Sequence, residues 1–129
     1  MKIPSFIACA AIGLFAFTAP SLAHAHSRVV SSTPAEGSAV AKPKTVTLTF
    51  SEALTPATTA ASIVMTAMPG VKDHGEMLIR NFTAAWSNGN RTLTMTLRQP
   101  LHSGTYEVRW QSVGADGHRM NGKVGFTVK

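Results

Sequence analysis

The chain has 129 residues, a formal net charge of +6 and a single cysteine. That length suits one domain with one core, and the scattered Lys and Arg residues, without basic runs or interleaved aromatics, do not predict nucleic-acid binding. Because Cys9 lies near the N-terminus, thiolate metal sites and cysteine nucleophiles are excluded from the rest of the chain.

Residues 1–25 have the organisation of a cleavable signal peptide. Lys2 gives the start of the chain a positive charge, residues 7–17 are apolar and uncharged, and small residues follow. The apolar run is too short, and its flanks are wrong, for a stable membrane-spanning helix. We therefore expect export to the periplasm and a mature protein that is not embedded in the membrane.

Two cleavage points satisfy the small-residue rule for such leaders. Cleavage after Ala25 uses alanine at both key positions, Ala23 and Ala25, and makes His26 the first residue of the mature protein. Cleavage after Ala23 would begin the mature protein at His24 instead. The first site is the better match, and either one exposes an N-terminal histidine.

Residues 26–129 are expected to form the single mature domain, built from short strands separated by turns. The clearest strands alternate apolar residues with threonine or charged residues, which is the pattern of a half-buried strand. About seven strands are predicted, at 28–33, 45–50, 61–68, 76–82, 92–97, 106–110 and 124–128, with one helical turn near 54–60. The fold class is therefore all-β, as a single Greek-key β-sandwich or barrel.

The order of the predicted strands places two connections at opposite ends of this domain. If each strand crosses the sandwich, the connection 114–119 returns to the end where the mature chain begins. The connection 69–75 falls at the other end, about one strand length or ~20 Å away. Residues in these two connections are therefore expected to belong to separate sites.

At the N-terminal end, the residue types favour Cu(II). The free α-amine and the imidazole of His26 could chelate one copper ion, while Asp116 and His118 place two more donors on a short loop that Gly117 allows to bend tightly. Nitrogen and oxygen donors suit Cu(II). The alternative is an ordinary Asp-Gly turn followed by a solvated histidine.

At the far end, the residue types favour Cu(I). Thioether sulfurs prefer the reduced ion and an imidazole is compatible with it, which makes Met65, Met68, His74 and Met77 candidate ligands. The alternative is that these methionines fill gaps in the core. Core packing explains Met95, which lies on an alternating apolar face, better than it explains the methionines that border the Pro-Gly turn of this loop.

Several segments, taken together and in order, resemble the CopC family of periplasmic copper-resistance proteins. They are 26–38, 50–52, 64–70, 104–106 and 110–118. The resemblance implies a cupredoxin-like or immunoglobulin-like β-sandwich that binds Cu(II) through His26, Asp116 and His118. In the methionine-rich members it also implies a Cu(I) site, which here would use Met65, Met68, His74 and Met77, although Val71 stands where those members have another methionine.

We therefore expect a non-enzymatic periplasmic protein that carries or buffers copper in both oxidation states. The resemblance implies transfer to a CopD-type inner-membrane protein or a multicopper oxidase. Two other classes stay open at this point. A copper-dependent oxidative enzyme could use the same N-terminal histidine chelate, and a metal-free β-sandwich adhesion module would need neither cluster.

Overall fold

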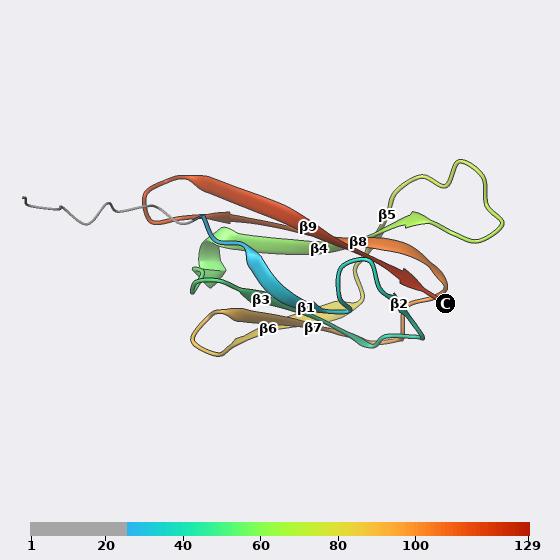
Figure 1. Ribbon diagram of the computed structural model, residues 1–129, viewed down its shortest axis with the longest axis horizontal. Helices are drawn as coiled ribbons and strands as arrows, with labels where there is room; N and C mark the ends of the chain where they lie inside the picture. The colour runs from blue at the N-terminus through green and yellow to red at the C-terminus, as the bar shows by residue number, and fades with distance from the viewer. Residues whose placement is uncertain (1–25) are drawn as a thin grey trace, which may run out of the picture.

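The computed structural model describes residues 26–129, which form a β-sandwich of two facing sheets (Figure 1). One sheet has the strand order β1-β3-β7-β6 and the other has the order β2-β9-β8-β4-β5. The strands are β1 (Val29–Thr33), β2 (Ala39–Val40), β3 (Thr45–Phe50), β4 (Thr59–Ala67), β5 (Met77–Ile79), β6 (Phe82–Ser87), β7 (Thr92–Leu97), β8 (Gly104–Val113) and β9 (Arg119–Val128). A single 3-10 turn, η1 (Pro56–Thr58), lies within the predicted helical turn, and no helix among the described residues is long and apolar enough to cross a membrane.

The all-β sandwich is confirmed, but the predicted number of strands is wrong, because residues 26–129 form nine strands instead of about seven. The short strand β2 was not predicted, and it pairs in parallel with the end of β9 over two residues. The predicted strand 76–82 is also split. Its first part is β5 in the five-stranded sheet, whereas Phe82 begins β6 in the other sheet, so the chain changes layers at Arg80 and Asn81.

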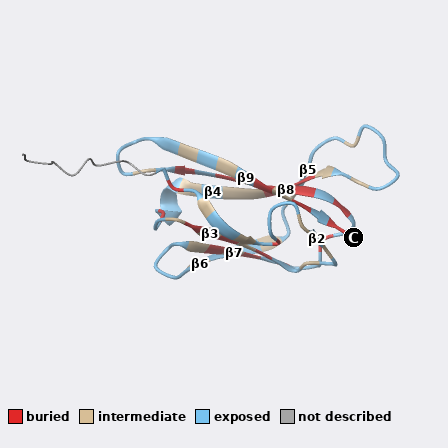
Figure 2. Ribbon diagram, in the orientation of Figure 1, coloured by how far each residue is buried: buried red, intermediate tan, exposed pale blue. Residues whose placement is uncertain are grey.

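The period-two pattern places the core correctly. Inward-facing residues of β3, β7, β8 and β9 are almost fully buried, and Figure 2 shows buried stretches along both layers. Burial of these apolar side chains is the main favourable contribution to folding. The buried residues that the alternation predicts are Val46, Leu48, Phe50, Leu93, Met95, Leu97, Tyr106, Val108, Trp110, Val124, Phe126 and Val128.

The two predicted ends of the domain also lie where expected. Residue 26 and the connection between β8 and β9 are at one end of the sandwich, and the long connection between β4 and β5 is at the other (Figure 1). The extra strands do not disturb this arrangement because β5 and β6 together make a single crossing. The two candidate sites are therefore well separated in the fold.

Candidate metal centres

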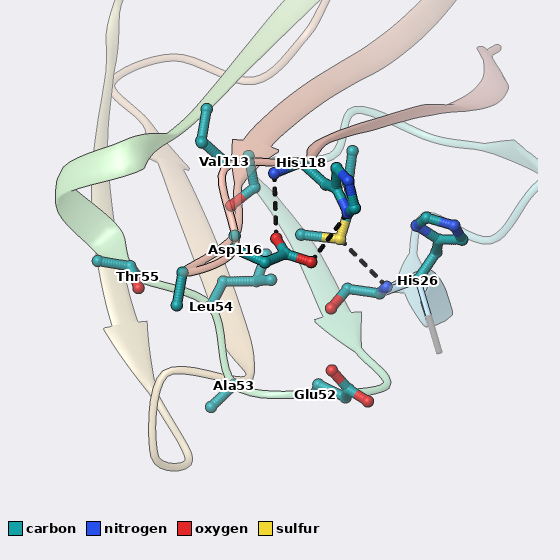
Figure 3. A pocket seen from close by; sticks show the side chains of 13 residues that line it. His26, Glu52, Ala53, Leu54, Thr55, Val113, Asp116 and His118 are labelled. Atoms are coloured by element: carbon teal, nitrogen blue, oxygen red, sulfur yellow. Dashed lines mark hydrogen bonds and ion pairs between the residues drawn. The ribbon is translucent and has the colours of Figure 1, made fainter. Parts of the chain in front are cut away.

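A pocket of about 410 Å³ opens at the N-terminal end of the sandwich (Figure 3). Three chain segments line it: residues 26–27, the connection after β3, and the hairpin between β8 and β9 with its adjoining strand ends. The side chains in its lining that carry nitrogen, oxygen or sulfur atoms are His26, Ser27, Glu52, Thr55, Ser112, Asp116, His118 and Met120. All three residues predicted for Cu(II) thus line one pocket.

Two hydrogen bonds hold the segment before β1 against the connection after β3. The Ser51 backbone N–H donates to the Arg28 carbonyl at 2.8 Å, and the Arg28 N–H donates to Ser51 Oγ at 3.1 Å. The next residue, Glu52, consequently lines the same pocket as His26 (Figure 3). Sequence reasoning did not assign Glu52, although its position two residues after a strand that ends at the N-terminal end of the sandwich would have indicated it.

The hairpin between β8 and β9 pairs the carboxylate of Asp116 with the imidazole of His118. Gly117 has a φ of 80°, a conformation that suits glycine, and the Gly114 N–H donates to the His118 carbonyl at 2.9 Å. Asp116 Oδ1 accepts from the His118 N–H at 3.0 Å, and its Oδ2 lies 2.9 Å from His118 Nδ1. A carboxylate on Nδ1 orients an imidazole for coordination through Nε2.

His26 shares the pocket with this pair without joining it in one cluster. Among residues 26–129, no three His, Cys, Asp or Glu side chains gather closely enough to hold a metal ion. Figure 3 shows the His26 ring beside the pocket, apart from the Asp116–His118 pair. In the 129-residue chain the nitrogen of His26 belongs to a peptide bond, so a chelate through a free amine would require cleavage before His26.

At the opposite end, the candidate Cu(I) ligands surround the connection between β4 and β5. Met65 and Met77 are direct cross-strand partners and so share one face of the sheet. Met65 is only 2% exposed, whereas Met77 is 43% exposed and Met68 is half-buried against the core. These methionines therefore span the range from core to solvent on one side of the loop.

His74 carries an unusual polar atom in this loop. Its Nδ1 is buried and has no hydrogen-bond partner among the residues that the structure describes. An unpaired buried polar atom costs free energy, so native proteins normally give it a partner. A metal ion in the loop would be such a partner, and the donor set of three thioethers and one imidazole fits Cu(I).

An ion pair fixes the loop where it re-enters the sheet. Arg109 in β8 donates to both carboxylate oxygens of Glu76, with Nη2–Oε1 at 2.6 Å and Nη1–Oε2 at 2.9 Å. Arg109 Nε also donates to Glu107 at 2.9 Å. Hydrogen bonding from Arg109, together with its charge, lowers the pKa of Glu76, which therefore stays ionised at neutral pH. Sequence reasoning gave Arg109 and Glu76 no role.

Comparison with known proteins identifies the family. The CopC domain matches residues 29–129. The chain belongs to the CopC family. Among its relatives, a CopC-family protein from Pseudomonas syringae pv. tomato, named copper resistance protein C, is 43% identical over 127 residues, which cover 97% of this chain and 95% of the relative. Copper resistance protein C from Escherichia coli is 38% identical over 107 residues, covering 83% of this chain and 84% of that protein.

Solved CopC-family structures have the same fold. PcoC, a methionine-rich copper resistance protein from Escherichia coli, superposes with a TM-score of 0.70 at 38% identity, covering 81% of this chain and 100% of that one. CopC from Methylosinus trichosporium OB3b gives a TM-score of 0.62 at 30% identity, covering 81% of this chain and 94% of that one. The sandwich is thus the CopC-family fold over nearly the whole described region.

Proposed function

We propose that this CopC-family protein acts in copper resistance as an exported, non-enzymatic carrier or buffer of copper in the periplasm. Membership of a family whose relatives are named copper resistance proteins supports copper as the cargo. One observation carries the proposal: a single pocket at the N-terminal end collects His26, Asp116 and His118. The predicted signal peptide, residues 1–25, lies outside the described residues and supports the location through its sequence alone.

Cu(II) is the cargo of this pocket. Signal-peptide removal converts the His26 nitrogen into a primary amine, which chelates the ion together with its own imidazole. His118 adds a second imidazole through Nε2, and the carboxylate of Asp116 both orients that ring and supplies an oxygen. Glu52 adds another carboxylate to the same lining. Nitrogen and oxygen donors of this kind favour Cu(II) over the reduced ion.

Cu(I) is the cargo of the loop between β4 and β5. Met68 and Met77 supply accessible thioethers, Met65 supplies a third from the core, and the buried Nδ1 of His74 gains a partner when the ion binds. Val71 contributes no donor. The exposed position of Met77 lets an incoming ligand from a partner protein reach the ion, which suits a carrier that exchanges its cargo.

The partners proposed for transfer are an inner-membrane CopD-type protein and a multicopper oxidase. Each can accept copper from a small soluble sandwich without any chemistry on the carrier itself. The separation of the two sites allows either oxidation state to be delivered from its own end of the molecule. Measuring the transfer of bound copper from this protein to a purified CopD-type protein or multicopper oxidase would test this step directly.

The test of the proposed function is a Cu(II) titration of two forms of the protein. One form begins at His26, and the other carries one additional residue before His26. Because the extension removes the amine from its chelate, Cu(II) affinity should fall by at least 100-fold while Cu(I) affinity at the far loop stays within about twofold. Equal Cu(II) affinity in the two forms would contradict the N-terminal chelate.

A further inference from the structure

A methionine lies in the nitrogen and oxygen pocket as well as in the far loop. Met120 is the second residue of β9 and pairs directly with Ser112, a buried residue that also lines the pocket. The side chain of Met120 is half-buried and contacts the edge of the core. It differs from Met95, which is fully enclosed, because it lines the core and the pocket at once.

Two contacts define where the thioether of Met120 lies. The Ser27 backbone N–H donates a hydrogen bond to Met120 Sδ at 3.3 Å, which fixes the sulfur one residue from His26 (Figure 3). The Met120 methyl group lies 3.6 Å from the position that a Cβ would occupy at Gly114, and Asp116 Oδ1 lies 2.9 Å from that same position. The thioether therefore lies between the start of the mature chain and the Asp116 carboxylate.

We propose that Met120 is a thioether ligand that lets this pocket retain copper when Cu(II) is reduced to Cu(I). The proposal rests on the proposed function, because it requires the pocket to be a copper site. A thioether sulfur has two lone pairs, so the hydrogen bond from Ser27 leaves the second pair able to coordinate the ion. The bond also holds the sulfur in the lining of the pocket before copper arrives.

The chemistry of the donor set explains why one sulfur would matter. The amine and carboxylate donors suit Cu(II), whereas thioether and imidazole donors suit Cu(I). When Cu(II) takes one electron from a one-electron reductant such as ascorbate, the ion becomes Cu(I). It can then exchange carboxylate coordination for the sulfur of Met120 while keeping His26 and His118. Without the sulfur, the reduced ion would keep only the two imidazoles as well-matched donors and would be held less tightly.

The test uses the protein that begins at His26 and carries Met68→Leu and Met77→Leu, so that the far loop no longer competes for Cu(I). Met120→Leu is then added, because leucine is close to methionine in volume and preserves the packing. We expect the Cu(II) affinity to change by less than about threefold and the Cu(I) affinity to fall at least tenfold. If the Cu(I) affinity falls tenfold relative to the Cu(II) affinity, the reduction potential of the bound copper falls by about 59 mV.

Met95→Leu in the same background is the matched control, since it removes a core thioether that lies outside the pocket. It should leave both copper affinities and the potential unchanged. X-ray absorption of the Cu(I) form should show a copper–sulfur distance that disappears only with Met120→Leu. Thermal unfolding of each variant identifies any effect that arises from misfolding.

The outcomes separate the two proposals. If the background protein fails to bind Cu(II), both the proposed function and the role of Met120 are wrong. If it binds Cu(II) tightly but Met120→Leu holds Cu(I) as well as its parent does, only the role of Met120 is wrong. Retention of the copper–sulfur signal after Met120→Leu would overturn that role in the same way.

Discussion

Arg109 and Glu76 form a two-point ion pair between the centre of a sheet and the end of the loop proposed to bind Cu(I). Both terminal nitrogens of the guanidinium group contact the carboxylate, at 2.6 and 2.9 Å. Glu76 directly precedes Met77, so this contact fixes one candidate ligand relative to β8. The pair is exposed, and its effect on overall stability is expected to be small.

Arg109→Lys should therefore weaken Cu(I) binding more than it weakens the fold. Lysine keeps the charge but cannot make the planar two-point contact, so Met77 loses its fixed position. We expect Cu(I) affinity to fall about three- to tenfold in competition with a chromogenic chelator, with an unchanged melting temperature. Arg98→Lys, which changes an exposed arginine outside the loop, is the control. Parent-like Cu(I) affinity in Arg109→Lys would show that the ion pair does not position the ligand.

Replacement of both accessible loop thioethers tests the Cu(I) site itself. In the protein beginning at His26, Met68→Leu with Met77→Leu should lower Cu(I) affinity in the loop by at least 100-fold and leave Cu(II) affinity near its parent value. The fold should tolerate each change at a cost under about 1.5 kcal/mol. If chelator competition shows no loss of loop-bound Cu(I), these methionines only pack against the core.

Asp116→Asn tests how the carboxylate serves the Cu(II) pocket. Asparagine preserves an oxygen acceptor for the His118 N–H but removes the negative charge beside its Nδ1. If Asp116 only orients the imidazole of His118, Cu(II) affinity should fall about 10–100-fold. If the Asp116 carboxylate also coordinates the ion, the loss should be larger. Asp73→Asn at the other end is the matched control, with no expected change. An Asp116→Asn variant that binds Cu(II) like its parent would remove Asp116 from the site.

Tyr106 should make the fold sensitive to alkaline pH. It is the only tyrosine, it is fully buried, and its hydroxyl donates to the His102 carbonyl at 2.7 Å. Burial disfavours the tyrosinate and raises the pKa of Tyr106 in the folded state above its ordinary value near 10. The stability that this provides is present below about pH 10 and is lost as pH rises further.

Tyr106→Phe should remove this component of alkaline unfolding. At neutral pH the free energy of unfolding of the variant should be about 1 kcal/mol lower, because the His102 carbonyl loses the hydrogen bond from the Tyr106 hydroxyl. Above pH 10 its stability should fall less steeply than that of the parent in denaturant unfolding. Parallel curves for the two proteins would mean that Tyr106 ionises as readily when folded as when unfolded.

The alternation of apolar and polar residues along the strands was enough to predict the core, and the order of the strands was enough to predict which connections lie at each end of the sandwich. Val46 and Phe126 are buried because period two directly reports which side of a strand faces the other sheet. The division between β5 and β6 was missed because strand residues in different sheets obey the same local pattern. Phe82 and Trp86 follow that period within β6, and this was the signal for a second strand.

The candidate donors were easier to predict than the contacts that support them. A histidine after a predicted cleavage site, or methionines beside a turn, can be recognised from the local sequence alone. Arg109 reaches Glu76 across 33 positions of sequence, and Ser27 reaches Met120 across 93, so neither contact leaves a local pattern. Met120 lies outside the predicted strand 124–128, and its place in the pocket follows from its position near the start of the longer strand β9.

The loop between β4 and β5 is anchored firmly by β4 on one side and weakly by the three-residue strand β5 on the other. β4 is held on both sides by β8 and β5, whereas β5 is an edge strand bonded only to β4 at Ile63, Val64 and Met65. Breaking so few bonds requires far less free energy than unfolding the sandwich. Brief detachment of β5, together with opening of the Arg109–Glu76 ion pair, would move Met77 away from Met65. A copper ion bound in this loop is therefore expected to leave at a rate that depends more on the edge of the sheet than on global stability.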